Sequence, residues 1–221
     1  NADAIKPFLH HAAYFRDRQN AMGDFPYEFD WFESRAPWHS ALAQSRGASV
    51  MLRAYLLSGK KDYVVAAKQA FKRFSIRCED GGYSAIFPLT DSVYFEEYPD
   101  QKNAVINGFM ASLFGLYEVA TFLNDADSRV LFDDGINSLE RMLPHYTLKW
   151  WTLYDRFGPD SGSNVHSPRY QTMVINYLTV LAAITNSTTI LEYRDRWRGY
   201  DTNLGRARAY ILKAKRKILH R

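Results

Sequence analysis

The chain of 221 residues contains a single cysteine, Cys78. No disulfide can therefore form within it, which excludes a small scaffold held together by disulfides. A glycine-rich phosphate loop and the CxxC, HExxH and GxSxG patterns are also absent, so no motif indicates nucleotide-binding, thiol-redox, zinc-protease or serine-hydrolase chemistry. No pair of the six histidines has a convincing metal-ligand spacing with a carboxylate, and we expect neither a metal nor another cofactor.

Acidic residues are missing from residue 202 onward, where seven basic residues occur: Arg206, Arg208, Lys213, Lys215, Arg216, Lys217 and Arg221. The formal net charge of +4 therefore belongs to this end, and the rest of the chain carries −3. A basic excess confined to one terminal segment does not predict a nucleic-acid partner. The run KAKRK at 213–217 leaves two interpretations open: contact with an anionic surface such as a membrane, and a solvated terminal helix.

A long uninterrupted apolar run is also lacking. The most apolar stretch, 104–123, includes polar residues and a glutamate, so we interpret it as a buried core helix rather than a membrane span. Hydrophobic residues make up 47% of the chain and charged residues 24%, as in globular proteins. Aromatic residues are abundant, with 15 Tyr, 14 Phe and 5 Trp, and most of them are expected in the core.

Apolar residues recur mainly at three- and four-residue spacing, which predicts helices. The expected helices lie near 3–20, 39–58, 61–76, 103–123, 126–143, 167–185, 188–198 and 203–219. Two segments rich in β-branched and aromatic residues, 81–99 and 148–158, are typical of short hairpins. We therefore predict an all-α fold, an (α/α) toroid or an incomplete α/α barrel with short inserted β-hairpins. Its expected parts are residues 1–201, with 1–36 as a lead-in helix and loop, and a basic C-terminal helix over 202–221.

The densest polar and aromatic cluster is YFEEYP at 94–99. Neighbouring side chains on an extended segment point to opposite faces. Glu96 and Glu97 therefore cannot both face one cleft. A solvated hairpin end with one packed tyrosine is the alternative interpretation.

A second cluster, WWTLYDR at 150–156, precedes His166, Arg169 and Tyr170. An acid, a base and guanidinium groups beside aromatic rings suit a polyanionic sugar, whose carboxylate can pair with Arg156 or Arg169. Packing of the two tryptophans in the core is the alternative.

Several stretches resemble one known family. They are PWHSALAQSRGASVMLRAYLLSG at 37–59, FEEYP at 95–99, VINGFMASLFGLYEV at 105–119, LFDDGINSLERMLPHY at 131–146, TLYD at 152–155, VHSPRY at 165–170 and YRDRWRGY at 193–200. In order and wording they resemble the catalytic C-terminal domain of the D-glucuronyl C5-epimerases. The resemblance implies an (α/α) toroid that converts glucuronate to iduronate in a heparosan-type polysaccharide by removing the C5 proton and returning one from the opposite face.

The resemblance also implies roles for particular residues. The catalytic groups would be Glu97, Tyr98 and Tyr154, and Asn107 would donate a hydrogen bond to substrate. Gln44, His166, Arg169, Tyr170 and Arg156 complete the expected substrate-binding set.

One departure concerns the chemistry directly. The family places a third functional tyrosine before the histidine that matches His166, and Val165 stands there. Either Tyr170 supplies that phenol, or the acid on the second face has been lost.

Three hypotheses follow: a uronate C5-epimerase, a uronate lyase or hydrolase on the same scaffold, and a glycan-binding or assembly module without turnover. The expected partner is a uronate-containing polysaccharide or a lipid-linked oligosaccharide. A homodimer that completes the cleft is left open by analogy. So is the location: cytoplasmic or membrane-peripheral in a bacterium, the secretory lumen in a eukaryote.

Overall fold

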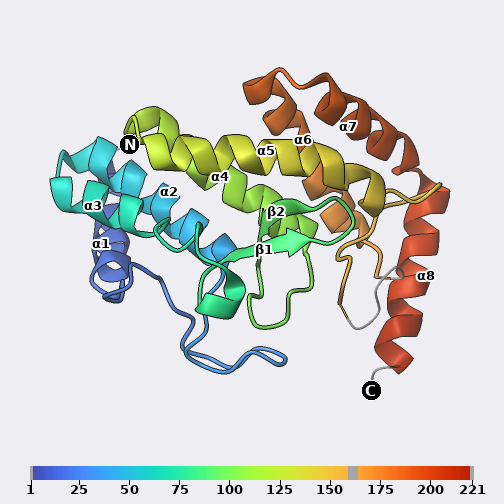
Figure 1. Cartoon of the computed structure of the whole chain (residues 1–221), viewed down its shortest axis with the longest axis horizontal. Coiled ribbons are helices and arrows are strands. Elements are labelled where there is room, and N and C mark those ends of the chain that lie inside the picture. Colours follow the sequence, from blue (N-terminus) through green and yellow to red (C-terminus); the bar gives the residue numbers. More distant parts are fainter. Residues whose placement is uncertain (1, 159–163, 220–221) are drawn as a thin grey trace.

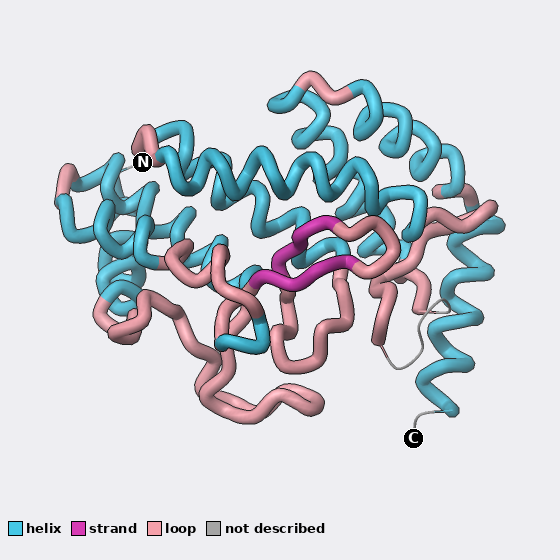
Figure 2. Tube along the Cα trace, in the orientation of Figure 1, coloured by secondary structure: helices cyan, strands magenta, loops and turns pink. Residues whose placement is uncertain are grey.

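The computed structural model describes residues 2–158 and 164–219, and this part contains eight α-helices, one short 3₁₀ helix and a two-stranded sheet (Figures 1 and 2). In chain order the elements are α1 (Ala2–Arg16), α2 (Ala41–Ser58), α3 (Lys61–Gln69), η1 (Cys78–Asp80), β1 (Ser84–Phe87), β2 (Ser92–Phe95), α4 (Ile106–Phe122), α5 (Ala126–Tyr146), α6 (Pro168–Thr185), α7 (Thr188–Tyr200) and α8 (Asn203–Leu219). The expected mostly helical fold is thus confirmed.

Six of the described helices form three hairpins, α2–α3, α4–α5 and α6–α7, because tight turns join the two helices of each. Gly59 ends α2 in the left-handed region at a φ of 69° and donates its N–H to the Tyr55 carbonyl over 2.7 Å. Asp125 caps α5 by accepting from the Ser128 N–H, and Ser187 caps α7 in the same way. The helix expected over 61–76 ends early, at Gln69, where a series of turns begins.

Helix α4 is the centre of the fold. It packs against α2 on one side and α5 on another, and most of its side chains are buried. The interpretation of 104–123 as a core helix is confirmed by this burial. Among the described helices, none is long and apolar enough to cross a membrane.

One of the two expected hairpins exists. Strands β1 and β2 pair antiparallel, with Ser84 opposite Phe95, and β2 packs against α5. The hairpin expected at 148–158 is wrong: this segment makes only isolated bridges, from Thr147 to Thr152 and from Leu153 to Val165. Inside it the Leu148 N–H donates to the Trp151 carbonyl and closes a turn, while later backbone groups bond to other segments, and the Trp151 side chain is fully buried.

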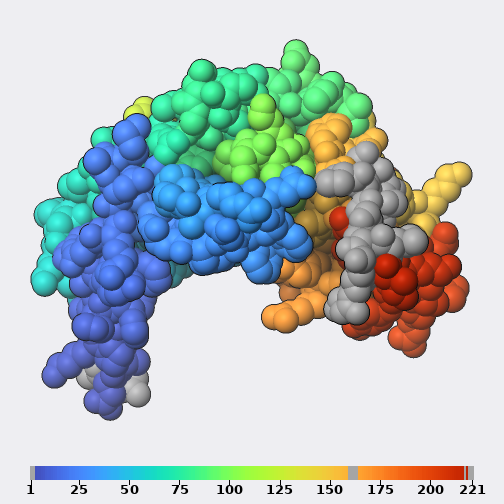
Figure 3. All heavy atoms as spheres, turned by 90° about the horizontal axis from the view of Figure 1, so that it is seen from below, coloured from blue at the N-terminus to red at the C-terminus, as the bar shows by residue number. Residues whose placement is uncertain are grey.

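The described helices are arranged in an arc. Seen from below, the described part of the chain makes an arch whose two legs are α1 and α8 (Figure 3). Helix α8 packs through Ala209, which is fully buried, and through Gly205, where an added Cβ would lie 3.0 Å from the Trp151 ring. The Arg208 guanidinium lies 3.9 Å above the Trp150 ring. The C-terminal helix is thus docked on the irregular segment at 148–158, and closure into a toroid stays a prediction.

The docking of α8 can be tested with two glycine variants. Gly205→Ala should lower the free energy of unfolding by about 1–3 kcal/mol, because its new methyl group overlaps the Tyr200 carbonyl and presses on Trp151. Gly199→Ala on α7 is the matched control: a Cβ there meets no atom within 4 Å, so the change should be neutral or stabilise by up to about 1 kcal/mol. Urea unfolding measures both, and equal effects would contradict the docking of α8.

Candidate active site

Three loop-rich segments, 17–40, 96–105 and the connection from α5 to α6, lie along one edge of the helices (Figure 2). The described parts of that connection are 147–158 and 164–167. This is the edge where both polar clusters seen in the sequence are found.

Glu96 faces the interior and fixes the loop before α4. Its carboxylate is fully buried, accepts from the Tyr94 hydroxyl, and lies 3.3 Å from the Ala104 N–H. The Tyr146 hydroxyl donates to the carbonyl of the same Ala104 over 2.6 Å. These contacts hold Ala104 at a φ of 52°, where residues with a Cβ are uncommon. Burial raises the pKa of Glu96 to about 8.

Glu97 faces the opposite way, toward the loops, as the alternation of side chains predicts. Its carboxylate lies against the first turn of α4, where Gly108 leaves the space: a Cβ on this residue would overlap the carboxylate. Glu97 is 8% exposed, and its Oε2 has no hydrogen-bond partner among the described residues. Burial raises the pKa of Glu97 to about 7.

Tyr98 connects Glu97 to a second phenol. Its hydroxyl interacts with the Glu97 carboxylate, with the Tyr154 hydroxyl and with the Trp31 indole. Its ring stacks on Trp38, with centroids 5.7 Å apart and planes 20° apart. Burial, followed by the charge of Glu97, raises the pKa of both phenols above their usual value. Both tyrosines are therefore neutral hydrogen-bond donors at neutral pH.

A small cavity of about 220 Å³ opens beside Glu97. It is lined by Tyr27, Phe29, Trp31, Trp38, Ser40, Glu97 and Tyr98. The Oγ of Ser40, like the Oε2 of Glu97, is buried with no described partner. The cavity thus combines aromatic walls with unpaired polar atoms, a combination suited to a sugar.

On the other side of Tyr98, Tyr154 packs against His166 and Tyr170. Ring centroids are 5.8 Å apart for Tyr154 and His166, and 5.7 Å apart for Tyr154 and Tyr170, with edge-to-face geometry in both pairs. The site residues of the second sequence cluster and those of the first are therefore neighbours through the Tyr98–Tyr154 contact.

A hydrogen-bond chain sets the tautomer of His166. The Gln171 Nε2 donates to the Trp197 carbonyl over 3.2 Å, and its Oε1 accepts from the Thr152 hydroxyl. The Thr152 Oγ1, 2.8 Å from His166 Nδ1, must then accept a proton from that nitrogen. Burial lowers the pKa of His166 to about 3, so the ring is neutral and its Nε2 carries a lone pair.

Unpaired buried polar atoms are concentrated in the predicted site. Glu97 Oε2, Asn107 Oδ1, Arg156 Nε and His166 Nε2 have no partner in the described residues. Native structures leave few such groups without a partner, and each calls for an explanation. A polar ligand that completes these hydrogen bonds is the simplest explanation for four on one edge.

Other predicted residues lie elsewhere. Gln44 is fully buried in α2, and its amide is occupied by the Phe25 backbone, at 2.7 Å to the N–H and 3.2 Å to the carbonyl. It positions the 17–40 loop, which does not support the expected substrate contact. Arg169 is exposed on the first turn of α6, and Tyr170 beside it is 39% exposed. Val165 is buried in the core, so its side chain cannot reach a ligand.

Sequence reasoning missed two groups of the site. Lys213 of α8 donates to Asn164 Oδ1 over 2.7 Å, and its Nζ lies 5.4 Å from the centroid of the Tyr154 ring. Asn164 in turn donates to the Asp155 carboxylate. No signal in the sequence links a lysine in a basic tail to a tyrosine nearly sixty residues earlier.

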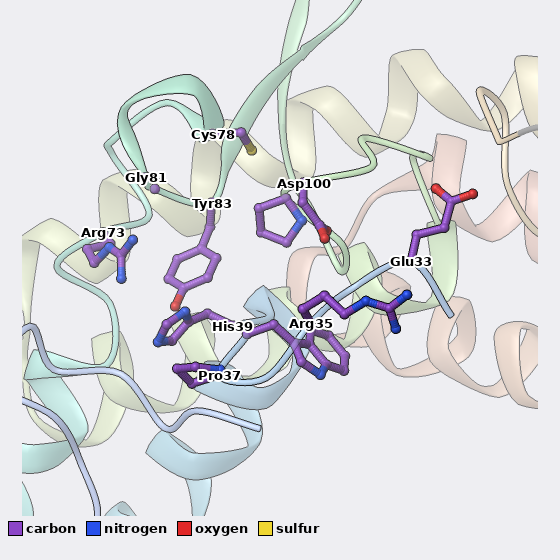
Figure 4. A pocket seen from close by; sticks show the side chains of 12 residues that line it. Glu33, Arg35, Pro37, His39, Arg73, Cys78, Gly81, Tyr83 and Asp100 are labelled. Carbon is purple, nitrogen blue, oxygen red and sulfur yellow. The ribbon is translucent and has the colours of Figure 1, made fainter. Parts of the chain in front are cut away.

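A larger cavity of about 460 Å³ adjoins the site and shares Trp38 with it. Figure 4 shows His39 and the Tyr83 hydroxyl close together on one side, with Arg35 and Glu33 further along. The charges of its walls are mixed in sign. Within the described residues no three His, Cys, Asp or Glu side chains are grouped to hold a metal ion.

The fold and site define a protein of helical hairpins with a buried carboxylate–phenol site beneath aromatic rings. The chain belongs to the family described as D-glucuronyl C5-epimerase C-terminus, whose model matches residues 19–199. The resemblance seen in the sequence is thereby confirmed.

Two similar proteins define the relationship further. A D-glucuronyl C5-epimerase of Caenorhabditis elegans is 33% identical over 178 residues, which cover 74% of this chain and 29% of that protein. An uncharacterized protein of Methanocaldococcus jannaschii is 26% identical over 178 residues, 79% of this chain and 56% of that protein. The chain thus spans 29% of the length of the first relative and 56% of the second.

A solved structure supports the fold. Its title names UGL with dGlcA-Glc-Rha-Glc, and it superposes with a TM-score of 0.58 over 90% of this chain and 55% of that one. The sequence identity is 15%, so the similarity concerns the arrangement of helices alone.

The raised pKa of Glu97 predicts a measurable effect on stability. A carboxyl group whose pKa is about 7 when folded and 4.5 when unfolded stabilises the fold fully below about pH 4.5 and loses that contribution as the pH rises through 7. Glu97→Gln removes this loss. At about 1.4 kcal/mol per pKa unit, the free energy of unfolding of the wild type should fall by about 3 kcal/mol more than that of the variant between pH ~4 and pH ~8.

Glu192→Gln, on the exposed face of α7, is the control for removing one carboxylate. The same pH dependence in wild type and Glu97→Gln would contradict the burial of the Glu97 carboxylate.

Proposed function

We propose that the chain carries the proton-transfer site of a polysaccharide uronate C5-epimerase, which inverts C5 of glucuronate to iduronate or acts on a related hexuronate. The observation that carries the proposal is the contact of Glu97 with Tyr98 and, through it, with Tyr154. Membership of the family and the likeness to a D-glucuronyl C5-epimerase support it.

The reaction needs a base for a weakly acidic proton, because C5 of a uronate is next to an ionised carboxylate. A general base works best when its pKa is near the working pH. Burial brings the pKa of Glu97 to about 7, so near neutrality a substantial fraction is ionised and can accept the proton. Its unpaired Oε2 is the oxygen available to do so.

The neighbouring phenols meet the second requirement. As the C5 proton leaves, negative charge moves onto the substrate carboxylate, and donors placed there lower the barrier. Tyr98 and Tyr154 remain protonated, since burial and Glu97 raise the pKa of both. Either can donate a hydrogen bond to the developing charge or return a proton to C5.

The reaction also needs a proton donor on the face of C5 opposite the base, and the second phenol, Tyr154, would supply it. Val165 is buried and has no proton to give. Tyr170 packs edge-to-face on Tyr154 and is partly exposed. We assign the acid of the second face to Tyr154, with Tyr170 beside it as the phenol that replaces the missing tyrosine.

The aromatic cavity and its larger neighbour would hold consecutive sugars. Trp38 lines both, and flat indole faces suit sugar rings. The partner is accordingly a uronate-containing polysaccharide or a lipid-linked oligosaccharide. This extends the proposal from a single uronate to a chain of sugars.

Hydrogen exchange tests the proposal directly. Incubated in D₂O with heparosan or another uronate polysaccharide, the chain should introduce deuterium at C5, detected by NMR. Glu97→Gln, Tyr98→Phe and Tyr154→Phe should each slow exchange by about 10²- to 10⁴-fold, as expected for loss of a general acid or base. Tyr210→Phe, on an exposed part of α8, is the control for loss of a phenol.

Each competing function has its own outcome in that experiment. An unsaturated uronate product, detected by its absorbance, would indicate a lyase. Saccharide binding that survives Tyr98→Phe, with no exchange before or after the change, would indicate a binding module. No exchange with any uronate glycan would overturn the epimerase.

The space beside Gly108 gives a test in which no proposed catalytic residue is replaced. Gly108→Ala should displace the Glu97 carboxylate, because the added methyl group overlaps it. A displacement of about 1 Å can cost about 10²-fold in rate, so exchange should fall by that order. Gly199→Ala adds the same methyl group in open space and should leave exchange unchanged.

A further inference from the structure

We propose that Lys213, on the C-terminal helix α8, binds the carboxylate of the uronate and makes the site selective for an acidic sugar. This inference rests on the proposed function, whose site it completes. It also goes beyond the family relationship, since the matched residues end at 199 and α8 begins at Asn203.

Helix α8 is held where it can deliver this side chain. Ala209 is fully buried, and Gly205 lies against Trp151 in the segment that carries Tyr154. Lys213 follows Ala209 by one helical turn and lies on the same face. The packing thus directs one cation of the basic tail into the site, whereas Lys215 is exposed.

The position of the Lys213 ammonium is fixed by its neighbours. Asn164 donates through Nδ2 to the Asp155 carboxylate. This bond turns the Asn164 Oδ1 toward Lys213, whose Nζ donates to that oxygen over 2.7 Å. Nζ also lies 5.4 Å from the centroid of the Tyr154 ring, whose electron-rich face attracts a cation. An ammonium has three donors, so this arrangement orients the group without using all of its hydrogen-bonding capacity on Asn164.

The other cations of the region have different positions. The Arg156 guanidinium lies over Phe157, and the backbone N–H of Arg156 is bonded to the Asn103 carbonyl. Arg206 is paired with Asp201 at the start of α8. Lys213 is therefore the cation that the described residues place against Tyr154.

Such a cation would act on a uronate at two stages, when the sugar binds and when its C5 proton is removed. The ammonium compensates the carboxylate charge when the sugar binds, and it stabilises the extra charge when the C5 proton leaves. Tyr154 contacts Tyr98, which contacts Glu97, so the ammonium and the proposed base belong to one cluster of side chains. A neutral sugar gains nothing from that charge, which is the source of the selectivity.

The surroundings of Lys213 predict a pH dependence. Burial and the nearby Arg216 lower the pKa of Lys213 to about 8, while Asp155 acts in the opposite direction. His166 is close enough to be affected by the Lys213 charge but stays neutral, and Tyr154 keeps its proton. Uronate affinity should therefore fall as the pH rises through about 8, because the ammonium loses its charge.

Binding measurements with a matched pair of ligands test the inference. The ligands are a heparosan oligosaccharide and the same oligosaccharide with its carboxyl groups reduced to alcohols, titrated by calorimetry. Lys213→Gln should weaken binding of the acidic ligand by about 10- to 100-fold, the usual range for a charged hydrogen bond, and leave the neutral ligand unchanged. Lys215→Gln, with the same charge change on the same helix, is the control and should affect neither ligand.

The pH series separates direct contact from a structural role. Lys213→Arg should preserve selectivity for the acidic ligand and abolish the loss of affinity near pH 8, since arginine keeps its charge. Equal effects of Lys213→Gln and Lys215→Gln, or equal losses for both ligands, would overturn the inference.

Failure of the proposed function has a different signature from failure of this inference. If the wild type binds the acidic ligand selectively without C5 exchange, the carboxylate site stands and the epimerase falls. If exchange occurs but Lys213→Gln keeps its selectivity for the acidic ligand, the epimerase stands and Lys213 is not its carboxylate-binding group.

Discussion

The site depends on the opposite directions of two adjacent carboxylates. Glu96 turns inward, where Tyr94 and the Ala104 N–H hold it and fix the loop that leads into α4. Glu97 consequently turns outward, against the space left by Gly108. Burial raises the pKa of both groups, but one ties β2 to the central helix and the other faces the loops with an unpaired oxygen.

Helix α4 gives this pair a rigid base. It is packed between α2 and α5, and its first turn carries Asn107 and Gly108 to the edge where the loops gather. The second half of the site comes from the connection between α5 and α6, which brings Tyr154 to the phenol of Tyr98. Segments far apart in the sequence thus meet at one end of a helical scaffold, a common way to hold catalytic groups on loops.

The C-terminal helix changes the meaning of the net charge. In the sequence its cations form a tail distinct from a slightly acidic body. In the structure α8 is packed on the segment around Trp151, and Lys213 bonds to Asn164 beside Tyr154. At least one of these cations therefore lies against the candidate site, and its environment lowers its pKa. Local burial and geometry, rather than net charge, decide which charge can act on a ligand.

The features that depend on local backbone geometry could be predicted from the amino-acid sequence. Helical periodicity and caps such as Gly59 gave the helices, and the alternation of an extended segment separated Glu96 from Glu97. The tertiary structure decided what depends on distant partners. It made 148–158 an irregular segment with isolated bridges in place of a hairpin, buried Gln44 against Phe25, and placed Lys213 beside Tyr154. Backbone conformation is set within a few residues, whereas burial and contact depend on which segments the packed core brings together.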